Sequence, residues 1–352
     1  MLACKECIPC LGRNARELAR RSARGDEVLE RRIADEGMRI LADAEADGFT
    51  LPPPCYARRL IDNALSSCNG AVPDPWAKEK ADSTELAKRL LEKWECQKTQ
   101  LNTNDTNVNI NLCGSVALCE NNPANPVNPV EKKDFEHRLR LAIAGNILDF
   151  SIYADLDIAT AMEKMEEAFE KPICGEIISH RDTAAQRESL FTNANENPYV
   201  SALRERMEEA RSILWIFDNC GEAVFDRLLL EPYRAKVTLA VRGRPAFNDM
   251  TRAELAASGY PDGWAGGGVV SNDDGIPGVV DATCGAEFRA AFAAADLVVA
   301  KGQANFETMN ERTDKPIAFL FLAKCPVVCW TIGAEPGTIQ VRLHNFTLHS
   351  TL

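Results

Sequence analysis

Two oxygen-bearing side chains, Asp218 and Asn219, follow an apolar run and precede a helix-like pattern. The run Ile213–Phe217 is typical of a buried strand, and the pattern after Gly221 is typical of a helix. In open α/β sheets, ligands bind at the carboxyl ends of the strands. A carboxylate and an amide oxygen placed there suit Mg²⁺ or Mn²⁺, and a helix N-terminus attracts anions. The segment therefore indicates a metal and an anion held together, which suggests phosphate chemistry.

Polar residues recur just past the ends of several predicted strands. Continuous apolar runs predict strands at Ile213–Phe217, Lys236–Val241, Gly268–Ser271, Leu297–Ala300 and Ile317–Phe321. Helices are predicted between them at Glu222–Leu230, Arg252–Ser258 and Glu287–Ala295. This alternation implies a parallel, doubly wound sheet, so the polar residues should meet at one edge. Asp218, Asn219 and Asp249 could then share one divalent cation, and Lys301 could neutralise phosphate oxygens.

Each of these residues also has an ordinary structural interpretation. Asp218 and Asn219 before a glycine could form only a turn and a helix cap. Asp249 could equally be the N-cap of the helix predicted at Arg252–Ser258, and Lys301 could be a solvated strand end. The repetition at successive strand ends favours a binding cleft, but by itself it selects no reaction.

The composition is that of an ordinary globular protein, and the 352 residues suggest two domains. The net charge of −12 argues against nucleic acid as a partner, although a local cluster could still bind a small phosphorylated metabolite. No apolar run approaches a membrane span, and no signal peptide is visible, so we expect no membrane association and a cytoplasmic location. The sequence leaves the oligomeric state open.

The order of the predicted elements divides the chain near residue 172. Helical periodicity dominates residues 1–172, whereas strands and helices alternate in residues 173–352. An Asn-rich segment at about residues 98–130 is predicted to be a loop or disordered insert within the helical part. We therefore predict an N-terminal all-α domain followed by an α/β domain.

The cysteine run Cys4, Cys7 and Cys10 supports a different hypothesis. It lacks the second half of a tetrahedral zinc site, although Cys55 or Cys68 could supply a fourth ligand. Packing of buried cysteines as small apolar side chains is the preferred interpretation. The alternative function is a non-catalytic metal-binding or redox module. A methyltransferase or dinucleotide oxidoreductase ranks last, because no Gly-rich first turn is followed by a ribose-binding acid.

Several segments, in order along the chain, resemble those of the metal-dependent damage-control phosphatases, which have an acidic-residue-methyltransferase-like metal-binding domain. These segments are Cys7–Leu11, Gly145–Phe150, Asp218–Glu222, Arg242–Pro245, Asn248–Asp249, Ala300–Thr308 and Ala323–Val328. The resemblance covers nearly the whole chain apart from the Asn-rich insert and the C-terminal end. Leu322 departs from it, because a lysine is expected there, although Lys324 is nearby.

The resemblance implies a helical domain packed on a Rossmann-like α/β/α sandwich, with metal and phosphate bound between them. It implies that Asp218, Asn219 and Asp249 hold the cation and that Lys301 contacts the substrate phosphate. The other residues expected to bind substrate are Asn146, Asp149, Asn272 and Asn305.

Together, these features predict a divalent-metal-dependent phosphatase that hydrolyses phosphomonoesters of small metabolites, such as sugar phosphates or damaged phosphorylated cofactors. Its expected catalytic residues are Asp218, Asp249 and Lys301. Oxygen ligands accept Mn²⁺, Mg²⁺, Co²⁺ and Ni²⁺ to different degrees, so the sequence does not select the metal. The nucleophile is also left open between a metal-activated water, Asp218 and Asp249.

Overall fold

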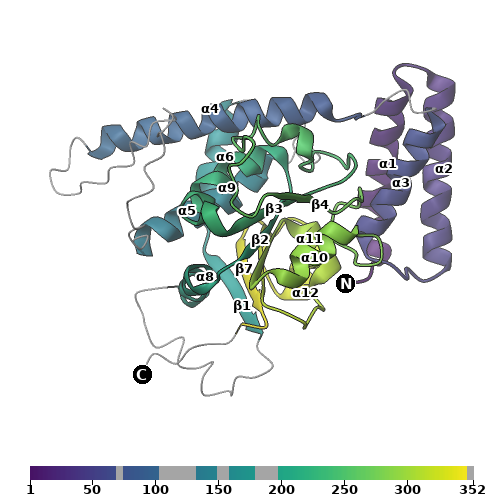
Figure 1. Cartoon of the computed structure of the whole chain (residues 1–352). Coiled ribbons are helices and arrows are strands. Elements are labelled where there is room, and N and C mark those ends of the chain that lie inside the picture. Colours follow the sequence, from purple (N-terminus) through teal and green to yellow (C-terminus); the bar gives the residue numbers. More distant parts are fainter. Residues whose placement is uncertain (69–73, 103–131, 149–157, 179–196, 347–352) are drawn as a thin grey trace.

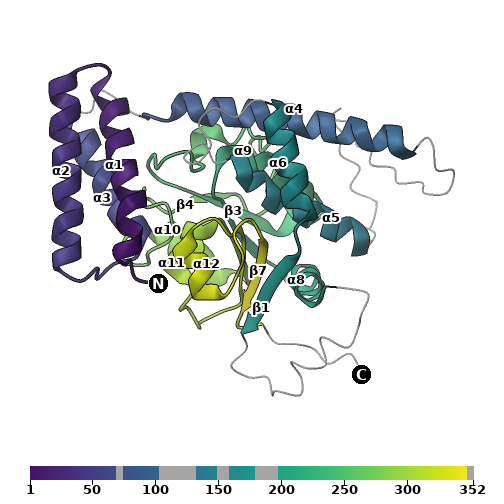
Figure 2. The same cartoon turned by 180° about the vertical axis from the view of Figure 1, so that it is seen from behind.

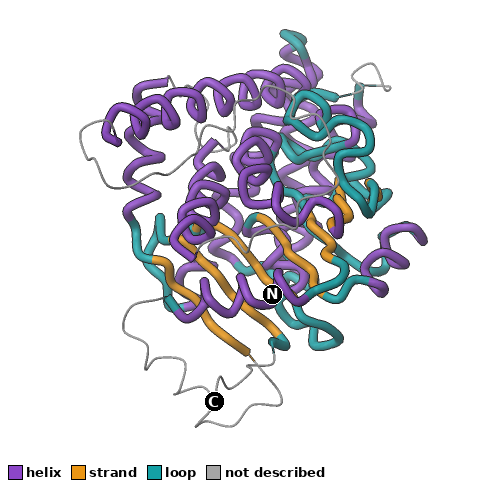
Figure 3. The backbone as a smooth tube through the Cα atoms, turned by 60° about the vertical axis from the view of Figure 1, so that its left-hand side comes forward, coloured by secondary structure: helices purple, strands orange, loops and turns teal. Residues whose placement is uncertain are grey.

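The computed structural model describes residues 1–68, 74–102, 132–148, 158–178 and 197–346. Within them, a seven-stranded sheet in the order β1-β7-β6-β5-β2-β3-β4 has helices packed on both faces (Figures 1 and 3). The strands are β1 (Ile173–Ile178), β2 (Ile213–Ile216), β3 (Val237–Val241), β4 (Val269–Ser271), β5 (Leu297–Lys301), β6 (Ile317–Leu322) and β7 (Ile339–His344). The predicted α/β fold with a mostly parallel sheet is confirmed.

The central strands β2 to β6 are mutually parallel, whereas β7 runs antiparallel to β6 and pairs in parallel with β1. The sequence predicted the five central strands to within a residue at each end but missed β1 and β7. In β7, apolar residues alternate with Gln340, Arg342 and His344, so this strand lacks the continuous apolar run that revealed the others.

The order of the strands reverses between β2 and β5. From β2 the chain passes to β3 and β4 on one side, and it then returns to β5 on the other side. Ile216 is paired with Ala300 across the two strands, so the segments containing Asp218 and Gly302 leave the sheet side by side. Ligand sites form at such a reversal because the connections diverge to opposite faces of the sheet.

Successive residues of each strand face opposite layers of helices. Trp215 packs in the core formed with α4 (Ala77–Asn102), α5 (Lys132–Ala144), α6 (Ile158–Glu170), α8 (Pro198–Glu209) and α9 (Cys220–Leu230). Leu214 and Ile216 pack instead in the core formed with α10 (Ala286–Ala294), α11 (Gln303–Met309) and α12 (Pro326–Ile332). The sheet is therefore the middle layer of a three-layer sandwich.

A bundle of α1 (Ile8–Ala23), α2 (Glu27–Ala46) and α3 (Pro53–Ser67) lies beside the sandwich with a core of its own (Figures 1 and 2). Helices α4 to α6 share their core with the sheet, so buried apolar contacts continue across residue 172. The predicted division into domains at that residue stays a prediction. Arg58 on α3 donates to the backbone oxygens of Pro245 (3.2 Å) and Gly275 (3.1 Å), which ties the bundle to loops at the edge of the sheet.

One predicted boundary differs from the structure. Helix α4 continues to Asn102, past the predicted start of the Asn-rich insert, and residues 103–131 lie outside the described part of the chain. Helix α5 is followed directly by a 3₁₀ turn, η2 (Gly145–Leu148). No helix in the described ranges is long and apolar enough to cross a membrane.

Helix α11 carries a buried carboxyl group, Glu307, and its burial raises its pKa from 4.5 to about 7. Because the folded-state pKa is raised, this group's contribution to stability is complete below pH 4.5 and is lost as the pH rises through 7. Glu307→Gln keeps an acceptor for the Gln303 amide and cannot ionise. We expect the free energy of unfolding in urea to be similar in the two proteins near pH 5. At pH 8 it should be higher in the variant by up to about 3 kcal/mol, because only the wild type must ionise a buried group. Equal pH dependence in both proteins would contradict this expectation.

Candidate functional site

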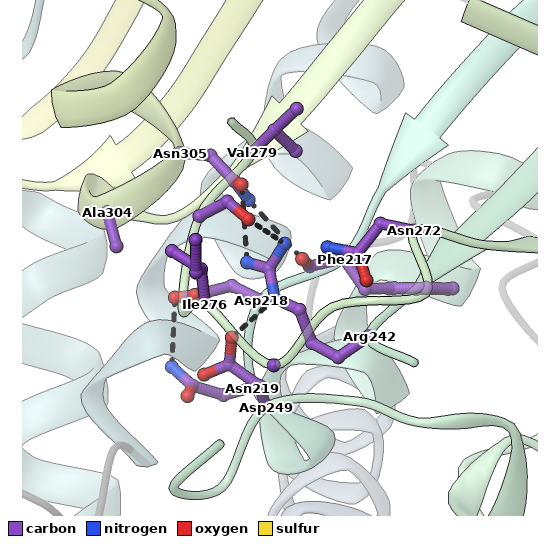
Figure 4. Close-up of polar contacts among 12 residues, drawn as sticks. Phe217, Asp218, Asn219, Arg242, Asp249, Asn272, Ile276, Val279, Ala304 and Asn305 are labelled. Atoms are coloured by element: carbon purple, nitrogen blue, oxygen red, sulfur yellow. Dashed lines mark hydrogen bonds and ion pairs between the residues drawn. The ribbon is translucent and has the colours of Figure 1, made fainter. Parts of the chain in front are cut away.

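Three predicted oxygen donors meet at the reversal between β2 and β5. Asp218 follows β2, and its backbone oxygen accepts a hydrogen bond from Met250 N (2.8 Å). Asn219 and Asp249 form an isolated antiparallel bridge, which places two segments far apart in the sequence side by side. Figure 4 shows the side chains of Asp218, Asn219 and Asp249 gathered on the same side of the sheet edge. The convergence predicted from the strand ends is therefore present.

The ordinary interpretations of these residues do not describe the structure. Asn219 occupies the N-cap position of α9 but makes no side-chain cap; its amide nitrogen donates to Asp218 Oδ2 (3.1 Å). The helix predicted at Arg252–Ser258 is wrong, because only the 3₁₀ turn η4 (Arg252–Glu254) forms, and its cap is Thr251. Asp249 is therefore not a helix cap, and its carboxylate has a different partner.

Asp249 is held by a buried guanidinium that the sequence did not identify as a site residue. Arg242 Nε donates to Asp249 Oδ2 (2.7 Å), and Arg242 Nη2 donates to Asn305 Oδ1 (3.2 Å). Asn305 Nδ2 donates in turn to the backbone oxygens of Lys301 (2.6 Å) and Phe217 (3.3 Å). Asn305 thus links the ends of β2 and β5 to Arg242 (Figure 4), and its predicted contact with substrate stays a prediction.

Gly302 makes room for the carboxylate of Asp218. Its φ of +78° lies in the region that favours glycine, and a Cβ there would stand 2.0 Å from Asp218 Oδ2. The glycine after β5 is therefore required for Asp218 to lie against the end of the neighbouring strand. This explains the Lys-Gly pair at the end of β5 in physical terms.

On the helical side, Asn146 in η2 reaches the same carboxylate. Its Nδ2 donates to Asp218 Oδ2 (3.0 Å) and to Glu222 Oε2 (2.8 Å). Its backbone oxygen accepts a hydrogen bond from the half-buried ammonium of Lys324. Asn146 therefore lies beside Asp218, and its predicted contact with substrate stays a prediction, whereas Asp149 falls outside the described residues.

Lys301 is neither a solvated strand end nor exposed to a ligand. Its ammonium is fully buried and donates to Glu222 Oε1 (2.6 Å), Asp226 Oδ1 (2.7 Å) and the backbone oxygen of Ala142 (2.8 Å). Burial alone would lower its pKa, but the two carboxylates outweigh burial and raise it, so the group is a cation. These contacts use all three N–H bonds. A direct contact with phosphate, as the resemblance implied, would require one of them to break.

Two buried amide groups beside the site have unpartnered nitrogens. Asn272 Oδ1 accepts from the backbone nitrogens of Gly243 (3.0 Å) and Asp274 (3.1 Å), whereas its Nδ2 has no partner among the described residues. The same holds for Nδ2 of Asn248, which the sequence had not assigned to the site. Buried donors of this kind are suited to an oxyanion.

The donor set fits a hard divalent cation. Asp218 and Asp249 supply carboxylates, and the donation from Asn219 Nδ2 leaves its carbonyl oxygen for a metal. In the described part of the chain, no group of three or more His, Cys, Asp or Glu side chains could hold a metal, so the site depends on this amide.

The N-terminal cysteines do not form a comparable centre. Cys4 and Cys7 approach with an Sγ–Sγ distance of 3.7 Å, and Cys10 is exposed. Burial raises the pKa of the Cys7 thiol to about 12, so it carries almost no thiolate near neutral pH. This arrangement agrees with cysteines that pack as small apolar side chains.

The fold and the site together define an α/β sandwich protein with a candidate ligand site at the reversal of its strand order. Comparison with known proteins gives the family. The profile described as "Damage-control phosphatase ARMT1-like domain" matches residues 3–339, so the chain belongs to that family.

Proteins with similar sequences align with large parts of this chain. A damage-control phosphatase from Pyrococcus horikoshii is 34% identical over 221 residues, which is 62% of this chain and 68% of the relative. One from Archaeoglobus fulgidus is 27% identical and covers 90% of this chain and 91% of its own. The crystal structure of the DUF89 family protein PH1575 from P. horikoshii shares the fold, with a TM-score of 0.69 and 24% identity over 97% of this chain and 98% of the other.

Gly302→Ala tests the packing of Asp218 against the end of β5. The new Cβ would displace the carboxylate, so we expect Mn²⁺ affinity, measured by electron paramagnetic resonance, to fall at least about tenfold. Gly333→Ala is the matched control, because Gly333 has a φ of +66° but no neighbouring atom within 4 Å of the place that a Cβ would take. Gly333→Ala should lose roughly 1 kcal/mol of stability, because Gly333 is in the left-handed helical conformation (φ 66°, ψ 34°). Gly302→Ala should lose more, because its conformation (φ 78°, ψ 157°) is one that almost only glycine adopts. Equal Mn²⁺ affinity in the two variants would refute the packing role.

Proposed function

We propose that this protein is a divalent-metal-dependent phosphatase that hydrolyses phosphomonoesters of small metabolites, either sugar phosphates or damaged phosphorylated cofactors. The observation that carries the proposal is the convergence of Asp218, Asn219 and Asp249 beside the first turn of α9. Membership of a phosphatase family, with relatives named damage-control phosphatases, supports the phosphatase role.

In this proposal, Asp218, Asn219 and Asp249 would hold a divalent cation such as Mn²⁺, Mg²⁺, Co²⁺ or Ni²⁺. When bound, such a cation polarises a phosphoryl group and offsets its negative charge. The chain's own donors would orient the phosphate: the N-terminal turn of α9 and the unpartnered Nδ2 of Asn272. Lys324 would add positive charge at the rim, because its ammonium already lies against Asn146. Fixed donors of this kind supply most of the catalysis in phosphoryl transfer.

The alternative was a metal-binding or redox module built on the N-terminal cysteines. A buried thiol with a pKa of about 12 is a poor nucleophile near neutral pH, and among the described residues no three His, Cys, Asp or Glu side chains come together as metal ligands. No observation among the described residues favours that function, so the phosphatase is the proposal.

Asp218→Ala tests the proposed centre. We expect kcat/KM for p-nitrophenyl phosphate with Mn²⁺ to fall at least about 100-fold, because one of two anionic ligands is lost. The thermal unfolding temperature should change little, since Asp218 is only half-buried. Cys7→Ser, at the rejected centre, should retain wild-type turnover. Substantial phosphatase activity in Asp218→Ala would end the assignment.

Chelation tests the metal requirement separately. EDTA followed by desalting should abolish hydrolysis of sugar phosphates and cofactor phosphates, and restored activity should depend on which of Mn²⁺, Mg²⁺, Co²⁺ and Ni²⁺ is added. The substrate with the highest kcat/KM in this screen would identify the chemical class. Full activity after complete removal of metal would show that the oxygen cluster is not a metal centre.

A further inference from the structure

Lys301 belongs to a closed group of buried charges that touches the proposed metal centre only indirectly. Its ammonium pairs with Glu222 and Asp226, and all three side chains are at most 1% exposed. Asp226 is further fixed by Trp215 Nε1, which donates to its second oxygen (3.3 Å). A lone ammonium in such surroundings would be costly, so the pairing dictates where these side chains lie.

Glu222 connects this group to Asp218 through one amide. Glu222 Oε1 accepts from Lys301 (2.6 Å), and Oε2 accepts from Asn146 Nδ2 (2.8 Å). The same nitrogen donates to Asp218 Oδ2 (3.0 Å). Since two carboxylate oxygens face one end of the amide, only the nitrogen can occupy that end. The orientation of Asn146 therefore depends on Glu222 remaining a double acceptor.

We propose that Lys301 and Glu222 are positioning residues that act through Asn146 to orient the carboxylate of Asp218 for metal binding, and that Lys301 does not contact the substrate phosphate. This inference rests on the proposed function, because it takes Asp218 to be a metal ligand. The binding partners of the lysine at the end of β5 are then the protein's own carboxylates, not the substrate phosphate.

Removal of the ammonium should change the position of Asp218 through these contacts. In Lys301→Met, Glu222 and Asp226 would be two buried carboxylates without their cation, so they repel each other and Glu222 Oε1 has lost its donor. Glu222 is then no longer held in place, and its position relative to Asn146 changes. Since Asn146 Nδ2 is shared between Glu222 and Asp218, the donor that orients the carboxylate of Asp218 is displaced as well.

Glu222→Gln should disturb the same link without removing the cation or changing the volume. A glutamine has one acceptor oxygen and one donor nitrogen, whereas Lys301 and Asn146 are both donors. One of the two must therefore face the glutamine NH₂ group. We therefore expect both variants to bind the metal more weakly, and we expect neither substitution to change the affinity for phosphate directly.

The test separates metal affinity from phosphate affinity in the full chain. The Kd for Mn²⁺ is measured by titration without substrate, and the Ki of inorganic phosphate is measured at saturating Mn²⁺ with p-nitrophenyl phosphate. We expect Lys301→Met and Glu222→Gln to raise the Mn²⁺ Kd at least about tenfold. The Ki of phosphate at saturating metal should change less than about threefold, since the donors to phosphate are intact.

Lys80→Met is the matched control. Lys80 is also fully buried and also pairs with two carboxylates, Asp74 (2.8 Å) and Glu254 (3.5 Å), neither of which belongs to the Lys301 group. Lys80→Met should lose comparable stability in urea and keep its Mn²⁺ Kd within about twofold, because Lys80 is not part of the group that orients Asp218 through Asn146.

Two outcomes would overturn the inference. One is a wild-type Mn²⁺ Kd with a Ki of phosphate raised about tenfold or more in Lys301→Met, which would make Lys301 a phosphate ligand. The other is a wild-type Mn²⁺ Kd in Glu222→Gln, which decides the matter even if Lys301→Met fails to fold. If the wild type binds Mn²⁺ but hydrolyses no phosphomonoester, the proposed function fails, and the Mn²⁺ titrations still test the positioning role.

Discussion

The site depends on one carboxylate being held in place at the reversal of the sheet. Asp218 Oδ2 accepts from the amides of Asn146 and Asn219, and the absence of a side chain at Gly302 leaves space for it. These three residues come from a 3₁₀ turn, a helix cap and a strand end. An ionised group at this point needs several donors to offset its desolvation. The surrounding structure can be understood as the means of bringing those donors together.

Buried ion pairs do most of this positioning. Arg242 fixes Asp249 on one side, and Lys301 fixes Glu222 on the other. Such pairs contribute little net stability, because desolvation offsets much of their attraction, but breaking one leaves a buried charge without a partner. In this protein we interpret them as devices for orientation. They hold the acidic side chains in fixed positions before a metal binds, so that metal binding does not have to order these side chains.

The loops at the site are braced from outside the sandwich. Arg58 of α3 binds backbone oxygens of two loops, and a Cβ on Gly275 would meet its guanidinium at 2.1 Å. Phe247 and Asp273 have φ values of 48° and 60°, which are unfavourable for residues other than glycine. Each is adjacent to an asparagine whose Nδ2 lacks a partner among the described residues. The bundle thus gives the loops the support that such strained conformations need.

The sequence by itself determined the central strands and the edge at which Asp218, Asn219 and Asp249 meet, because apolar runs and parallel topology are local patterns with a known spatial consequence. It could not determine which charged residues are buried. Lys301 is the last residue of β5 and Lys324 follows β6, yet Lys301 is enclosed by Glu222 and Asp226 whereas Lys324 lies half-buried against a backbone oxygen. Glu222 and Arg242 were likewise visible in the sequence without any sign of their contacts. Apart from the Arg242–Asp249 pair, those contacts join distant parts of the sequence, so only the packing of helices on the sheet decided them.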